Sequence, residues 1–139
     1  MFLDKWLYLD KKSQAQMGEK NQDAINKIFK LNKKIRFVAI ISDSGEVIKS
    51  EMKSSIHSLL SKSTEKKFCK DVSERKKMRQ EFNKSLGKVR YVNVERENIS
   101  QIVVYVNSKS VFVTVEPEIT TSGKSLLISK IKKLTSNLK

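Results

Sequence analysis

The chain has 139 residues, of which 38% are hydrophobic, and this is enough for one folded domain with its own core. It carries 29 Lys and Arg against 15 Asp and Glu, a net charge of +14 that favours anionic partners such as nucleic acid, acidic lipid or an acidic protein surface. The single cysteine, Cys69, excludes an intrachain disulfide and predicts a cytoplasmic protein, and the single histidine, His57, excludes a His-rich metal site.

Residues 1–10 contain the only tryptophan and place Phe2, Trp6 and Leu9 on one helical stripe. The segment is too short for a signal peptide or a membrane span. It is either a terminal helix that packs on its own domain or an amphipathic anchor that makes a peripheral contact with a membrane or a partner. We favour the first interpretation, because its two aspartates would be repelled by an anionic membrane.

Helical spacing becomes regular at Asp23. The polar residues 11–22 predict a linker or a helix start, so the chain divides into an N-terminal segment, 1–22, and a domain, 23–139. A predicted helix then runs to Lys33-Lys34, and its apolar face consists of Ala24, Ile25, Ile28, Phe29 and Leu31.

A β-hairpin follows this helix. Residues 35–42 (IRFVAIIS) are apolar on both alternating faces, which is typical of a strand covered on both sides. Asp43-Ser44-Gly45 predicts a tight turn, and residues 46–50 predict the returning strand. Residues 53–60 resume helical spacing and predict a short helix that carries His57 on its surface.

The stretch 63–96 predicts a long basic helix, a stop at Gly87 and a strand. Ser61 or Ser63 offers an N-cap. On a helical wheel one apolar face collects Phe68, Val72, Phe82 and Leu86.

Arg75 and Arg79 fall in the middle of that apolar face, where an arginine needs an explanation. Their stems could pack on the core while the guanidinium groups reach water. Alternatively, they form fork-shaped ion pairs with a carboxylate, from Glu95, Glu97, Glu116 or a partner chain. Both interpretations remain open.

Three strands are predicted at 88–95, 101–106 and 111–115, and a last helix at 124–138. The middle strand is apolar on both faces, so layers must lie above and below the sheet. The predicted fold class is α/β (α+β): one five-stranded, mainly antiparallel sheet with helices on both faces, in the order α-β-β-α-β-β-β-α.

The sequence contains only fragments of catalytic or ligand-binding motifs. Ser122-Gly123-Lys124-Ser125 resembles the end of a phosphate-binding loop, but Glu118 stands where that loop needs glycine, so a helix start is the better interpretation. The carboxylates Asp43, Glu46 and Glu51 surround an exposed turn, which lacks the cleft that acid–base catalysis needs. We therefore predict no enzyme, no cofactor and no metal.

The basic character is concentrated between Lys62 and Arg90, where eleven cations accompany four anions. Such a cluster is typical of proteins that bind nucleic acid, but these proteins usually also have aromatic side chains on which the bases stack. Here Tyr91, Tyr105 and Phe112 lie within predicted strands and are expected in the core. A nucleic-acid-binding protein and a small-ligand sensory domain remain the alternatives to an interaction module.

The order of elements over residues 23–138 resembles the Roadblock/dynein-light-chain fold, with longin and profilin as architectural relatives. The phrases KIRFVAIISDSGEVIKSEMK, ERKKMRQEFNKSLGKVRYVNVER and ISKIKKL also resemble a family of short archaeal proteins of unassigned function, known from ammonia-oxidising lineages. The positions that match its pattern are Arg75, Met78, Arg79, Glu81-Phe82, Leu86-Gly87, Tyr91-Val92 and Glu95-Arg96. That family usually has a Gly-rich turn after the hairpin, where this chain has Ser50-Glu51-Met52.

The Roadblock resemblance implies a non-catalytic module that forms a homodimer through a sheet edge and the long helix, and that binds small GTPases or assembles scaffolds. The residues that we expect to contact a partner are Arg75, Met78, Arg79, Phe82, Glu95 and Arg96.

Overall fold

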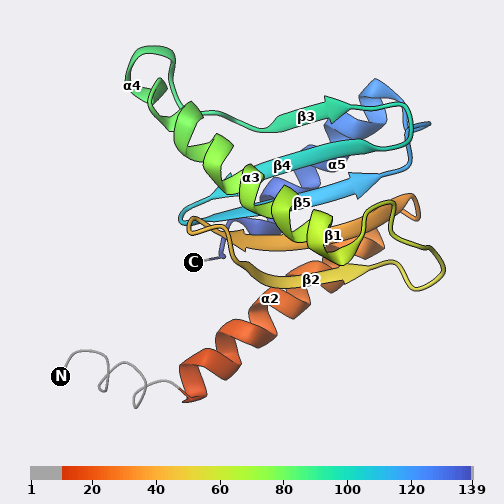
Figure 1. The fold of residues 1–139 in the computed structure, drawn as a ribbon, viewed down its shortest axis with the longest axis horizontal. Helices are drawn as coiled ribbons and strands as arrows, with labels where there is room; N and C mark the ends of the chain where they lie inside the picture. The colour runs from red at the N-terminus through yellow and green to blue at the C-terminus, as the bar shows by residue number, and fades with distance from the viewer. Residues whose placement is uncertain (1–10, 139) are drawn as a thin grey trace.

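The computed structural model describes residues 11–138, and the interpretations of residues 1–10 lie outside this range (Figure 1). In chain order, the elements are α2 (Lys11–Leu31), β1 (Ile35–Ser42), β2 (Val47–Met52), α3 (Lys62–Gln80), α4 (Asn83–Leu86), β3 (Val92–Glu95), β4 (Ser100–Val106), β5 (Lys109–Val115) and α5 (Thr121–Thr135).

The five strands form one antiparallel sheet in the order β2-β1-β5-β4-β3. This confirms the predicted α+β fold and its order of elements, with α4 as an additional single turn after the long helix. The central strands β1, β5 and β4 are the ones whose sequences are apolar on both faces. The edges are therefore β2 and β3.

Helices cover both faces of the sheet, as Figure 1 shows: α2 and α5 lie on one face, and α3 crosses the other diagonally. The larger core cluster lies under α2 and α5 and includes Ile25, Ile28, Val38, Ile40, Ile102, Val113, Leu127 and Ile131. The smaller cluster lies under α3 and consists of Phe37, Ala39, Ile41, Cys69, Val72, Val103 and Phe112. In the range 11–138, no helix has both the length and the apolar content that a membrane crossing requires.

Helix α2 begins at Lys11 and not at Asp23 as predicted. Residues 11–22 lack an apolar stripe, but they are mostly good helix formers and contain no proline. The division of the chain into segments 1–22 and 23–139 stays a prediction.

Residues 53–60 form a loop and not the predicted helix. The backbone N–H of Lys53 donates to the carbonyl of Arg36 (2.8 Å), and the Arg36 guanidinium donates to the carbonyl of His57 (3.3 Å). These two contacts attach the loop to β1. The N–H of Lys53 and the carbonyl of His57 therefore form hydrogen bonds with Arg36 and not within a helix. His57 accordingly lies in a loop and not on a helix face.

Strand β3 starts at Val92 and not at residue 88 as predicted, because residues 88–91 do not pair with β4. They follow Gly87, whose φ of +86° turns the chain in a way that other residues rarely allow. Tyr91, which was predicted in the core, is therefore exposed.

Helix α5 begins at Thr121, three residues before the predicted start. Thr120 is its N-cap, and its side chain accepts a hydrogen bond from the N–H of Gly123 (3.1 Å). The fragment Ser122-Gly123-Lys124-Ser125 lies in the first turn, which confirms its interpretation as a helix start.

Candidate interaction surface

Helix α3 faces the sheet with a different stripe from the predicted one. Ser61 is its N-cap, as expected, and accepts from the N–H of Thr64 (3.2 Å). The buried residues of the helix are Cys69, Val72, Ser73 and Lys76. The helix is therefore turned by about one residue relative to the predicted face, which moves the buried cation from an arginine to a lysine.

Lys76 is only 1% exposed. Its Nζ donates to Asp43 Oδ1 (2.8 Å) and to the carbonyls of Asn107 (2.6 Å) and Lys109 (3.3 Å). These three acceptors match the three N–H groups of an ammonium. In the sequence Lys76 is one of the eleven cations between Lys62 and Arg90, and no role of its own is predicted for it. Its spacing of four residues from Val72 and seven from Cys69 could have identified it.

Arg75 and Arg79 do not lie in the core. Arg75 is exposed, whereas Arg79 is half-buried and donates from Nη1 to the Tyr105 hydroxyl (2.7 Å). Among the described residues, neither arginine forms an ion pair. The alternative of an ion pair within the described chain is therefore wrong, and the pair with an acid of a partner stays a prediction.

Two of the acids expected to meet these arginines are engaged elsewhere. Lys124 Nζ contacts Glu95 Oε2 at 2.5 Å, and the Ser100 hydroxyl donates to the same oxygen (2.7 Å). The hydrogen bond from Lys124, followed by that from Ser100, lowers the pKa of Glu95. Arg36 Nη1 pairs with Glu116 Oε1 at 2.6 Å.

Arg96 also bonds within the chain, since its Nε donates to Gln101 Oε1 (3.0 Å). The register of β3 on β4 places Glu95 opposite Ser100, on the α5 side of the sheet. Glu95 and Arg96 therefore lie at the far end of β3 from the loop that follows α4, and the structure does not bring them to Arg75 or Arg79.

The end of α3, α4 and the segment before β3 expose four large apolar side chains. The predicted burial of Phe82 and Leu86 is wrong, because α3 ends at Gln80 and both residues belong to the following turn and α4. We call these four side chains together the α3–α4 surface. Their exposed fractions are 63% for Met78, 57% for Phe82, 81% for Leu86 and 47% for Tyr91. All four fall within residues 78–91, and exposed apolar side chains that are concentrated in one region are typical of interaction surfaces.

The free edge strand β3 lies beside this surface. Its Val92 and Val94 are only half-buried, and they share a narrow groove with Arg75 and Arg79 of α3. The groove remains open because α3 packs mainly over β1, β2 and β5. In Figure 1, α4 projects past the end of the sheet at which the chain enters β3.

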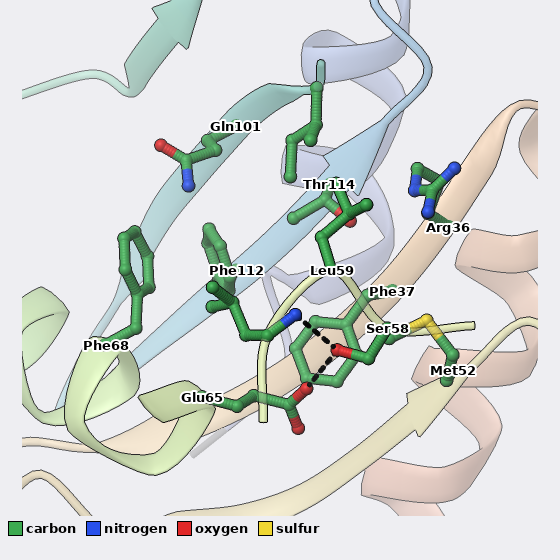
Figure 2. Close-up of a pocket in the computed structure, with 12 residues that line it drawn as sticks. Arg36, Phe37, Met52, Ser58, Leu59, Glu65, Phe68, Gln101, Phe112 and Thr114 are labelled. Carbon is green, nitrogen blue, oxygen red and sulfur yellow. Dashed lines mark hydrogen bonds between the residues drawn. The ribbon is translucent and has the colours of Figure 1, made fainter. Parts of the chain in front are cut away.

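A small cavity lies under the loop 58–60, as Figure 2 shows. Phe37, Phe68 and Phe112 line it, and the Ser58 hydroxyl donates to Glu65 Oε2 (3.1 Å) and thereby fixes the loop to α3. Its volume is about 50 Å³, far below the ~300–1,000 Å³ of ordinary ligand pockets. This cavity therefore gives the small-ligand alternative no support.

The aromatic residues offer little for nucleic acid. Phe112 is buried, and Tyr105 is half-buried with its hydroxyl bonded to Arg79, so both confirm the expectation that they pack within the fold. Tyr91 is the one of the three that is exposed. Cys69 is also buried, and this desolvation, with the charge of Glu65, raises the pKa of its thiol to about 11.

Comparison with solved structures identifies the fold. MglB, a gliding protein from Thermus thermophilus, superposes with a TM-score of 0.72 at 10% identity, covering 88% of this chain and 90% of that one. An MglB with a tetrameric arrangement gives 0.71 at 9% identity (88% and 89% covered), and a Roadblock/LC7 domain from Streptomyces avermitilis gives 0.60 at 13% (79% and 89%). At such identities the likeness establishes a Roadblock/MglB-like fold.

Sequence comparison finds one family. The model of DUF6659, a family of unknown function, matches residues 15–138. No curated protein matches the chain in sequence.

Proposed function

We propose, from the premise that the chain belongs to the DUF6659 family of unknown function, that it is a non-catalytic Roadblock-type module that forms a homodimer and binds protein partners. The proposed contact consists of the β3 edge together with the α3–α4 surface.

The observation that carries this proposal is the position of the α3–α4 surface beside an unpaired strand edge. Four of the nine large apolar side chains exposed in the described range fall within residues 78–91. An edge strand offers unpaired backbone donors and acceptors, and antiparallel pairing of two β3 strands about a two-fold axis perpendicular to β3 would satisfy both copies at once. Apolar contact at α3–α4 would supply the desolvation energy that a short edge strand lacks.

Arg75 and Arg79 fit a role at this contact, because their charges lack an acidic counterpart within the described chain. Met78 and Phe82 are the proposed anchors. Glu95 and Arg96 lie farther along β3, so we place them at the rim. The partner class implied by the Roadblock resemblance is a small GTPase, bound by the dimer as a scaffold or regulator.

The test replaces one exposed apolar residue on the surface and one elsewhere. Phe82→Asp should convert the dimer to a monomer in sedimentation equilibrium while leaving the free energy of unfolding in urea within about 0.5 kcal/mol of the wild type, because the side chain is exposed in the single chain. Leu126→Asp, at a similarly exposed site on α5, should remain dimeric.

A wild type that stays monomeric at the highest soluble concentration would remove the proposal. So would a pair of variants in which Leu126→Asp dissociates the dimer and Phe82→Asp does not.

A further inference from the structure

A second cavity, of about 240 Å³, lies where residues 88–91 leave the sheet. Continuing the register of β3 on β4 would place residue 88 opposite Asn107 and residue 90 opposite Tyr105. These pairs do not form, and the space between the diverging segment, the end of β4 and the last turn of α3 is the cavity.

The lining of this cavity is polar and cationic. Lys76, Arg79 and Lys88 all line it, and no Asp or Glu of the described chain does. The charge of Lys76 is compensated by Asp43, whereas Arg79 and Lys88 form no salt bridge within residues 11–138. Two uncompensated cations beside one partly enclosed space create a positive potential that favours an anion there.

Hydrogen-bonding groups around the cavity are also unsatisfied. The side chain of Arg79 makes one hydrogen bond within residues 11–138, from Nη1 to the Tyr105 hydroxyl, so the remaining N–H groups of its fork are available. Asn83 also lines the cavity, and its buried Oδ1 has no hydrogen-bond partner in the part of the chain that the structure describes. Such a group is costly unless a ligand or water meets it.

We propose that this cavity binds inorganic phosphate. Near neutral pH inorganic phosphate carries oxygens that can accept from Arg79 and Lys88, and it keeps a P–OH that can donate to Asn83 Oδ1, whereas a phosphomonoester, whose second pKa is about 6, is mostly a dianion without that proton. A sulfate or a carboxylate has no such proton at that pH. The volume is below that of pockets for drug-sized ligands, which suits a compact anion.

All residues that line the site belong to one chain, so it does not require the proposed dimer. It shares Arg79 with the proposed contact, and Lys88 is therefore the residue that distinguishes the two proposals. The experiment titrates the full chain with inorganic phosphate and with methyl phosphate, at constant ionic strength, and follows binding by ³¹P NMR and calorimetry. Sulfate and a short single-stranded DNA serve as competing anions. The variants are Lys88→Gln, Arg79→Gln and the control Lys84→Gln, which makes the same charge change at an exposed lysine outside the cavity.

The expected result is saturable binding of inorganic phosphate, stronger than that of sulfate or of methyl phosphate, which both lack the P–OH. Lys88→Gln and Arg79→Gln should each weaken it about fivefold or more, and Lys84→Gln by less than about twofold. Lys88 is exposed, so its variant tests the site even if Arg79→Gln does not fold. The proposal is overturned by absence of saturable binding, by equal affinity for sulfate, by binding of DNA alone, or by equal loss in Lys88→Gln and Lys84→Gln.

Discussion

Lys76 joins three parts of the chain at one nitrogen atom. It lies on α3, and its Nζ contacts Asp43 of the β1–β2 turn, the carbonyl of Asn107 in the β4–β5 turn and the carbonyl of Lys109 at the start of β5. A buried ammonium costs several kcal/mol unless charge and hydrogen bonds compensate it. Here both are present, so Lys76 fixes the position of α3 on the sheet, and with it the exposed side chains that follow in the chain.

Replacing this lysine should therefore lower the free energy of unfolding. Lys76→Met keeps the length of the side chain but leaves Asp43 and the two carbonyls without their donor, and we expect a loss of about 2–3 kcal/mol in the free energy of unfolding. Lys77→Met, at the exposed neighbour, should change it by less than about 0.5 kcal/mol. Urea denaturation measures both, and equal stabilities would show that the network contributes nothing.

At the scale of elements, β3 is the strand that is held least. It pairs with β4 alone, over four residues, and Glu95 at its end is clamped by Lys124 from α5. This clamp couples the first turn of α5 to the edge strand, so the helix on one face of the sheet helps to position the edge that we propose for dimerisation.

The contribution of the Lys124–Glu95 pair to the free energy of unfolding should depend on pH. Lys124→Met should lower the free energy of unfolding by about 1 kcal/mol at pH 6 and raise hydrogen exchange in β3, because Glu95 loses its partner. The folded-state pKa of Glu95 is lowered, so the contribution of the pair is complete above the ordinary glutamate pKa and fades as pH falls through the lowered one. The difference from the wild type should therefore shrink between pH 6 and pH 3. Lys130→Met, on the exposed side of α5, is the control, and a difference that is constant with pH would contradict this account.

Strands with apolar residues on both faces were predictable, because β1, β4 and β5 must be covered on both sides whatever the details of packing. The orientation of α3 was not, since Phe82 and Leu86 were assigned to its face although they belong to the next turn. The loop 53–60 has helical spacing, but the contacts of Lys53 and Arg36 that prevent a helix are tertiary. Met78 and Phe82, which were expected from the sequence to contact a partner, are exposed, and that role stays a prediction. The burial of Lys76 was missed, because the orientation of α3 on the sheet was assigned to a neighbouring stripe.

At the scale of the whole molecule, the charge of +14 opposes self-association, because two copies repel each other across any interface. Since the proposed contact is largely apolar, salt should strengthen it. We expect the dimer dissociation constant to fall about three- to tenfold between 0.05 and 0.5 M NaCl, measured by sedimentation equilibrium. Binding to nucleic acid would weaken steeply over the same range, so a complex with DNA or RNA that dominates at low salt would favour that alternative.

The separation of the two helical layers has a practical consequence for spectroscopy. Cys69 is buried on the side of α3 that faces the sheet, and a thiol with a pKa of about 11 is almost wholly unreactive near neutral pH. A cysteine introduced at the exposed Ser129 of α5 would thus accept a fluorescent dye alone, in an otherwise native background. Because α5 lies on the opposite face of the sheet from α3, the dye would report tumbling and complex formation without obstructing the α3–α4 surface.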